Sequence, residues 1–342
     1  FAFRNNFNLG LTLNTLVFDG SYFAGLRAAR VFKDYVSQQL LSTEQTVKNQ
    51  VIEAYLPALL VDESLVILKK DISNLEKILM ETRETYKAGF VEQLDVDRLD
   101  LSLANLMVEK SNLERQKQLA INSLKYTMGF PMNQELEVVD DLATLLEEAT
   151  NEQLAGNINF YNRPEYKVAE YGIRLSELNI DLYKAGYLPV VNAFASYQYG
   201  YQGNQLFRGE DGFWVPTALA GLRVNIPIFD GFEKRAKIDR AKIGLANARR
   251  DKTELERVIT LEVTNARTQY NEAQEQLSSQ EKNLALAEKI YNTTKVKYRE
   301  GVGSSLELTQ AEQALYQTQQ NKVQAMYQLL LAKKRLEIAL GN

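Results

Sequence analysis

The chain has 342 residues, of which 45% are hydrophobic and 25% are charged, a composition typical of folded rather than disordered proteins. It contains no cysteine and no histidine, which excludes disulfide scaffolds, thiolate or imidazole metal sites, cysteine nucleophiles and Ser-His-Asp triads. A net charge of −4 gives no reason to expect nucleic acid as a partner, and no run of 18 apolar residues is present to form a transmembrane helix.

Two halves of the chain repeat the same landmarks in the same order. Segment 8–20 aligns with segment 219–231, and the residues that recur identically in the first copy are Gly10, Leu11, Asn14, Phe18, Asp19 and Gly20. Farther along, Tyr86 and Gly89 match Tyr298 and Gly301. The sequence therefore predicts an internal duplication, whose two copies we expect to occupy equivalent environments.

The domain boundaries follow from this duplication. The first repeat covers 1–129, with a strand at 1–18 and a long helical hairpin at 22–128. A linker or equatorial region follows at 130–162. The second repeat covers 163–342, with a helix at 163–186, strands at 187–202 and 213–228, and a second long hairpin at 232–340. The first repeat lacks the leading helix and strand of the second. Because the sequence begins at Phe1 without a visible signal peptide, we expect it to start inside a longer precursor.

Within the predicted hairpins, apolar residues recur at alternating spacings of four and three, the period of a coiled coil. The seam of the first long helix runs from Val47 to Tyr86, and that of the second runs from Ile259 to Tyr298. Pro57 predicts a kink in the first helix. At ~1.5 Å per residue each long helix reaches roughly 100 Å, which is too long for an ordinary globular core.

The predicted strands alternate with a period of two. Apolar residues occupy one face and polar residues the other, and the aromatic residues Tyr197, Tyr199, Tyr201 and Trp214 gather near one end. This pattern is typical of lipid-facing strands with an aromatic girdle. The half-buried strands of a soluble sandwich alternate in the same way. Joined to helices of this length, however, the strands favour the membrane interpretation.

Three groups of motifs resemble the TolC-like outer-membrane efflux protein family, also called outer membrane factors. They are Arg163-Pro164-Glu165 followed by Ala185-Gly186-Tyr187-Leu188-Pro189, the Pro-Ile-Phe-Asp-Gly stretch at 227–231, and the two Tyr-x-x-Gly corners. The resemblance covers essentially the whole chain in the expected order. It implies an α+β membrane protein: a homotrimer with a β-barrel in the outer membrane that is continuous with a long α-helical coiled-coil barrel in the periplasm.

The resemblance also implies function. Such a trimer is a passive exit duct of a tripartite efflux or type I secretion system, and it is not an enzyme. Its partners are a periplasmic adaptor protein, an inner-membrane transporter and outer-membrane lipid, with no nucleic acid and no cofactor. The corner residues Tyr86, Gly89, Tyr298 and Gly301 match the family's periplasmic hairpin tips, which makes them candidate adaptor contacts. The glycines also have a structural explanation, because left-handed glycines terminate helices.

Three polar residues after the corners are candidates for a pore constriction. Glu307 and Asp95 match positions where the family places constricting carboxylates, and Gln310 matches a second constriction site but is uncharged here. In a trimer, one such carboxylate gives a ring of three negative charges, which selects cations. A structural explanation is also open, because acidic residues near a helix start stabilise the helix dipole. For Asp140-Asp141 and Glu147-Glu148 we expect a solvated acidic linker rather than a cation site.

Two other classes of function remain open on the residues alone. One is a soluble or surface coiled-coil scaffold, such as an adhesin stalk. The other is an enzyme that uses carboxylates, such as a glycosidase, although no carboxylate pair falls on an evident cleft. The sequence predicts no catalytic residue and no metal ligand.

Overall fold

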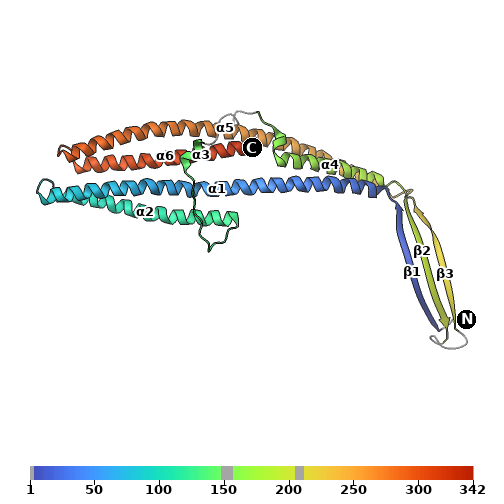
Figure 1. Ribbon diagram of the computed structural model, residues 1–342. Helices are drawn as coiled ribbons and strands as arrows, with labels where there is room; N and C mark the ends of the chain where they lie inside the picture. Colours follow the sequence, from blue (N-terminus) through green and yellow to red (C-terminus); the bar gives the residue numbers. More distant parts are fainter. Residues whose placement is uncertain (1–3, 148–156, 205–211, 342) are drawn as a thin grey trace. The chain divides into compact units, whose positions relative to one another are not determined.

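The computed structural model describes residues 4–147, 157–204 and 212–341 (Figure 1). Two long helical hairpins make up most of the chain, and three strands form one sheet. In chain order the elements are β1 (Asn5–Phe18), α1 (Gly20–Lys87), α2 (Gln93–Met128), α3 (Leu142–Glu147), a 3-10 turn η2 (Phe160–Asn162), α4 (Pro164–Ala185), β2 (Val190–Gly203), β3 (Phe213–Asn225), α5 (Glu233–Arg299) and α6 (Ser305–Leu340). No helix in the described ranges combines the length and the apolar character that crossing a membrane requires.

The chain divides into two compact units, and the boundaries of these units differ from those of the predicted repeats. One unit comprises Phe1–Leu40 and Pro164–Leu255, and the other comprises Leu41–Arg163 and Glu256–Asn342. Each unit therefore takes part of both sequence copies, because α1 and α5 are long enough to run through both units.

The sheet in the first unit is antiparallel, with strand order β1-β2-β3. Its register aligns Leu11 with Tyr197 and Tyr197 with Ala218, so one face carries these apolar side chains. The neighbouring row aligns Gly10, Gln198 and Thr217 on the opposite, more polar face. The predicted alternation is confirmed by this register. The third strand ends at Asn225 rather than at 228, because Pro227 has no amide hydrogen to donate to a ladder.

The apolar face of the sheet is exposed in the single chain. Leu11 is 81% exposed, and Leu9, Leu13 and Leu222 are also largely exposed. A contiguous apolar surface of this kind requires cover from lipid or from another protein surface. In the same unit, α4 is joined to α5 by ion pairs, Arg249–Glu177 at 2.9 Å and Lys252–Glu170 at 3.1 Å.

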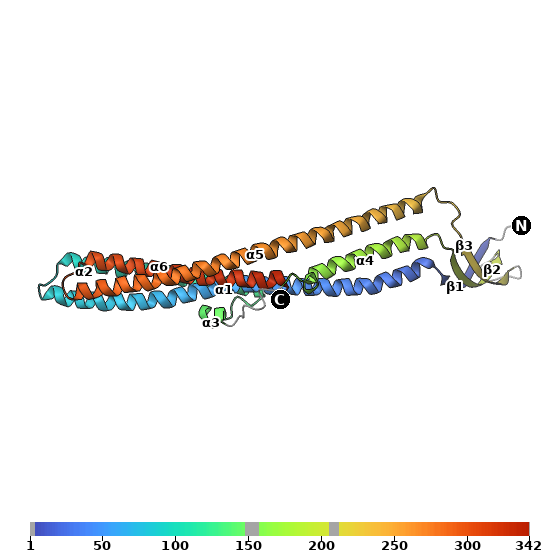
Figure 2. The ribbon, with the colours of Figure 1, turned by 90° about the horizontal axis from the view of Figure 1, so that it is seen from above.

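The second unit packs α1, α2, α5 and α6 around shared apolar clusters, with the antiparallel arms α5 and α6 side by side (Figure 2). The cluster nearest the hairpin tips takes Leu75 from α1, Leu99 from α2, Tyr291 from α5 and Leu308 from α6. A second cluster surrounds Leu68, and a third holds α3 through Leu142. The core of this unit is thus shared by both hairpins.

The burial of the long helices agrees with the coiled-coil seams. In α5, all twelve seam positions from Ile259 to Tyr298 are buried or half-buried. In α1 the seam is covered from Val51 to Thr82, but Val47 and Tyr86 at its two ends are exposed. Pro57 lies inside α1, which continues as one helix on both sides of it.

Candidate functional site

Each of the two Tyr-x-x-Gly corners ends with a glycine in the left-handed conformation. Gly89 has a φ of 82° and Gly301 a φ of 75°, backbone angles that residues other than glycine rarely adopt. The amide of Phe90 donates to the carbonyl of Thr85 at 3.1 Å, and that of Val302 donates to the carbonyl of Lys297 at 3.0 Å. Both glycines therefore end α1 and α5 as C-terminal caps, as the structural explanation predicted.

A cavity of about 370 Å³ lies between the two corners in the second unit. Its walls include Thr82, Phe90, Tyr298, Arg299 and Gly301. Phe90 is 82% exposed and Val302, at the equivalent position of the other corner, is 77% exposed. Sequence reasoning missed these two residues, although an apolar residue directly after each duplicated glycine was a visible signal.

The duplicated corner tyrosines occupy different environments. Tyr86 is exposed, whereas Tyr298 packs against the core cluster nearest the tips. The Tyr298 hydroxyl lies 3.1 Å from the hydroxyl of Thr82 on α1. The expectation of equivalent environments is therefore wrong at this pair, because the hairpins pack against each other and only one of the two tyrosines faces the shared interior.

Polar contacts near the corners join the two hairpins. Arg299 on α5 makes two bonds to Glu81 on α1, at 3.0 and 2.7 Å. Ser305, at the start of α6, is fully buried and donates its hydroxyl to Asp95 on α2 at 2.5 Å. Each bond links one hairpin to the other, so the two corners are held in register at this end of the unit.

The three constriction candidates differ in the contacts that their side chains make. Asp95 accepts from Ser305 and also from the backbone amide of Glu92 in a capping box. Its carboxylate therefore stabilises the start of α2 and the contact between hairpins. Glu307 lies in the first turn of α6, is exposed, and has no ion pair in the part of the chain that the structure describes. Gln310, one turn later, is exposed as well.

Two buried carboxyl groups lie deeper between the hairpins, and sequence reasoning did not single them out. Asp71 on α1 and Glu312 on α6 are 8% and 6% exposed. Burial raises the pKa of Asp71 to about 6 and that of Glu312 to about 7, and the charge of Asp71 adds to the effect on Glu312. Each directly neighbours an apolar seam position, Ile72 or Ala311, and this adjacency was the available signal.

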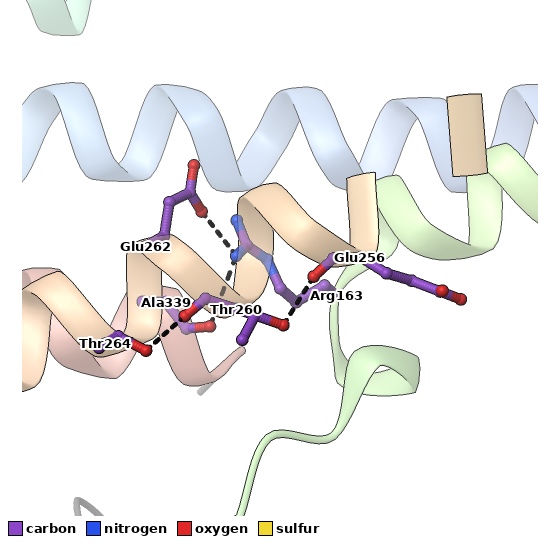
Figure 3. A network of polar contacts seen from close by, with 6 residues as sticks. All are labelled: Arg163, Glu256, Thr260, Glu262, Thr264 and Ala339. Carbon is purple, nitrogen blue, oxygen red and sulfur yellow. Dashed lines mark hydrogen bonds and ion pairs between the residues drawn. The ribbon is translucent and has the colours of Figure 1, made fainter. Parts of the chain in front are cut away.

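Arg163, the first residue of the Arg-Pro-Glu motif, has a structural role in the second unit (Figure 3). Its guanidinium donates to Glu262 on α5 at 2.8 Å and to the carbonyl of Ala339, in the last turn of α6, at 3.5 Å. Arg163 thus places a positive charge beside the Glu262 carboxylate and supplies a hydrogen-bond donor to a carbonyl near the end of α6. The segment before α4 is thereby fixed to the second hairpin.

The girdle candidates also differ in exposure. Tyr197, Tyr199 and Trp214 are exposed, and the rings of Tyr199 and Trp214 stack at 4.9 Å. Tyr201 is buried, with its ring 5.3 Å from that of Trp214. Three of the four residues therefore present aromatic surface at one end of the sheet. Within the described ranges, no cluster of three potential metal-ligating side chains is present.

Comparison with known proteins assigns the chain to a family. A model of the family described as outer membrane efflux protein matches residues 4–129 and 160–342. The chain belongs to the outer membrane efflux protein family. It therefore has the α+β TolC-like fold and functions as an exit duct located in the outer membrane and extending into the periplasm. The predicted family, fold class, function and localisation are confirmed.

Relatives within the family include both efflux and secretion proteins. The chain is 24% identical to the toluene efflux pump outer membrane protein TtgC of Pseudomonas putida, over 97% of this chain and 68% of the relative. It is 21% identical to the alkaline protease secretion protein AprF of Pseudomonas aeruginosa, over 97% and 69% of the two chains.

The fold of this family member is that of solved outer-membrane channels. Against the open-state MtrE channel of Neisseria gonorrhoeae the TM-score is 0.74, with 17% identity over 99% of this chain and 79% of that chain. Against VceC of Vibrio cholerae it is 0.73, with 15% identity over 99% and 87%. Members of the family are channel proteins rather than enzymes.

Proposed function

We propose that this protein acts as a homotrimer, the passive outer duct of a tripartite export system, and that it performs no chemical step. The observation that carries the proposal is a stripe of apolar side chains on the outward face of α2. The residues of this α2 stripe are Leu94, Leu101, Val108, Leu119 and Tyr126, and all are exposed. Their spacings of seven and eleven residues keep them on one side of the helix, opposite the core.

A second copy of the chain is the proposed occupant of the α2 stripe. The seven-residue spacing is that of a coiled-coil contact, so a helix from a neighbouring copy fits it in the way that the internal seams fit each other. The strand edges support the same arrangement, since β1 and β3 each have one edge unpaired within the described residues. Neighbouring copies would pair these edges and extend the sheet, with its apolar face toward outer-membrane lipid.

The trimer is tested by placing a charge on the α2 stripe. Leu101→Lys is expected to shift the chain from trimer to monomer in mild detergent, because a lysine at the contact would be desolvated without a partner. Gln118→Lys is the matched control, since Gln118 is exposed on α2 but lies off the stripe. Native mass spectrometry reads the stoichiometry. A monomeric wild-type chain, or a trimeric Leu101→Lys variant, would contradict the proposal.

The hairpin tips are the proposed docking site of a periplasmic adaptor, which in turn connects to the inner-membrane transporter. Supporting features are the cavity between the corners and the two highly exposed residues that follow the glycines, Phe90 and Val302. Exposed aromatic and aliphatic side chains beside a cavity are typical anchors for a protein partner. Of the predicted contacts, Tyr86 is exposed for such a partner, whereas Tyr298 and Gly301 line the cavity.

Removing the apolar anchor is expected to weaken adaptor binding. Phe90→Ser should lower the affinity for the cognate periplasmic adaptor about tenfold or more, because the side chain is lost from the centre of the contact. Val66→Ser is the control, since Val66 is an exposed residue of α1 remote from the corner. Surface plasmon resonance with the immobilised duct measures both variants. Equal affinities for the two would remove Phe90 from the docking surface.

Glu307 is the proposed constriction residue. Its exposed carboxylate and position in the first turn of α6 leave it able to face the three-fold axis of a trimer. Asp95 is a weaker candidate, because its carboxylate is engaged by Ser305 and by the capping box. Gln310 would add a second ring without charge.

A further inference from the structure

Asp71 and Glu312 bring two carboxyl groups from different hairpins into one apolar interior. Asp71 lies beside Leu68, Ile72 and Leu75 of the α1 seam, and Glu312 lies between Leu308 and Leu315 of α6. These leucines and the isoleucine are all buried. Asp71 and Glu312 therefore keep little contact with bulk solvent, at 8% and 6% exposure, and an ionised form must be stabilised mainly by protein groups.

The available hydrogen bonds are too few for two carboxylates. Glu312 accepts from the Ser102 hydroxyl on α2 at 3.4 Å, which is a long contact. Asp71 is hydrogen-bonded by the Gln319 side chain of α6, but its Oδ2 has no partner within the described part of the chain. A carboxylate is best stabilised by two or three donors, so this interior accommodates the neutral acids better than the anions.

The charged and titratable groups that face the pair come from all four helices. Lys70 on α1 and Lys295 on α5 favour the ionised forms, but burial outweighs them. The phenols of Tyr291 on α5 and Tyr316 on α6 lie close enough to feel the charge of Asp71. The remaining charged groups are more peripheral, namely Glu109 on α2, which acts on Tyr316, and Arg299 on α5, which acts on Tyr291.

The positions of the first hairpin that are equivalent to Lys295 and Glu312 differ from them in residue type and in exposure. At the positions equivalent to Lys295 and Glu312, the first hairpin carries Arg83 and Asp100, which form two bonds at 2.6 and 2.8 Å on the exposed surface. Glu312 is instead buried between the hairpins, with Asp71 as its acidic neighbour. The equivalent positions therefore hold a surface ion pair in the first hairpin and a buried acid in the second.

We propose that Asp71 and Glu312 form a proton-sensitive contact between the two helical hairpins of one chain. While both carboxyl groups are protonated, the interior is neutral and the hairpins pack closely. When both are ionised, two uncompensated negative charges lie in an apolar interior, and the hairpins separate to admit water. The contact requires only a single chain, so it does not depend on the trimer, the adaptor or the Glu307 ring.

The sign of the pH effect follows from the direction of the pKa shifts. In the unfolded chain both carboxyl groups titrate near pH 4, whereas in the folded chain their pKa values are raised to about 6 and about 7. The folded state thus holds more protons between these limits. The stability that these two groups contribute is greatest below about pH 4, falls as the pH rises from there through 6 and 7, and levels off at a higher pH. Burial also raises the pKa of Glu63, so this residue changes stability with pH in the same direction. Variants are therefore needed to separate the effect of Glu63 from that of Asp71 and Glu312.

Thermal unfolding of the full chain in detergent tests the proposal. The wild-type melting temperature is expected to fall by ~4 °C or more between pH 5.5 and pH 8.5. Glu312→Gln, which keeps the shape but cannot ionise, should lose at least half of this fall. Glu281→Gln removes an exposed carboxylate of α5 and should keep all of it. Parallel pH profiles for wild type and Glu312→Gln would overturn the proposal.

A measurement of the distance between the two hairpins tests the proposed contact without relying on the stability of any one variant. Because the chain has no cysteine, spin labels attach only at introduced sites, and Ala104→Cys on α2 with Gln313→Cys on α6 places them at exposed positions on the two hairpins. Labelled chains are diluted with unlabelled chains so that pairs within one chain are read. The distance distribution should broaden to longer values at pH 8.5, and Asp71→Asn should suppress the broadening. An unchanged wild-type distribution between pH 5.5 and pH 8.5 would overturn the contact regardless of the variants.

Discussion

Leu68→Asp is expected to destabilise the helical hairpins by more than about 4 kcal/mol and to prevent correct assembly. Leu68 has no exposed surface and packs against Val61, Leu65, Ile72 and Leu113. Removing a buried leucine alone costs ~2–5 kcal/mol, and the aspartate adds an unpaired charge in an apolar interior. Circular dichroism during heating measures the loss, and Leu68→Ala separates the cost of the cavity from that of the charge.

Leu284→Asp is the matched comparison. Leu284 occupies a seam position of α5, but it is only partly buried at the margin of the cluster nearest the tips. An aspartate there reaches solvent, so we expect a cost of roughly 1–2 kcal/mol. Equal losses for the two variants would show that the seam of α5 is covered by something other than the helices of its own chain. No loss for Leu68→Asp would show that the assigned coiled-coil register is wrong.

Glu307→Ala is expected to abolish most of the cation selectivity of the reconstituted duct. If Glu307 lines the pore of a trimer as proposed, three carboxylates surround the axis, and each at about 8 Å from a permeating cation contributes between ~0.5 and ~2 kcal/mol, depending on the effective dielectric constant. The three together amount to at least ~1.5 kcal/mol, which changes the ratio of cation to anion permeability about tenfold or more. Reversal potentials in a planar bilayer under a salt gradient measure this ratio directly.

The control for the proposed Glu307 ring is a variant that removes an exposed carboxylate from another part of the chain. Glu281→Ala removes an exposed acid from the shaft of α5 and should leave the reversal potential unchanged. Asp95→Ala is expected to act differently from both, because it removes the acceptor for Ser305 and the capping box of α2. It should loosen the contact between hairpins and raise conductance more than it alters selectivity. If Glu307→Ala keeps the wild-type reversal potential, Glu307 lies away from the axis and serves only the start of α6.

The sequence predicted the elements of this protein well because their signals are local. A 3.5-residue period fixes which side of a long helix is covered, and the structure buries that side from Ile259 to Tyr298. A two-residue period fixes the two faces of a strand, and the register of β1, β2 and β3 agrees with it. The glycines at 89 and 301 ended their helices as expected, since the left-handed conformation is a property of a few neighbouring residues.

What the sequence could not determine is which neighbour covers a given face. Tyr86 and Tyr298 stand at equivalent places in the repeat, yet only Tyr298 enters the interior that the hairpins share. Likewise, Asp95 and Glu307 occupy equivalent places after the two corners, but of these two carboxylates it is Asp95 that accepts from the Ser305 hydroxyl. Asp71 and Glu312 are separated by more than two hundred residues, and each alone reads as a polar position beside a seam. Their burial arises only where four helices converge, because desolvation depends on every side chain that excludes water from a group and not on its neighbours in the chain.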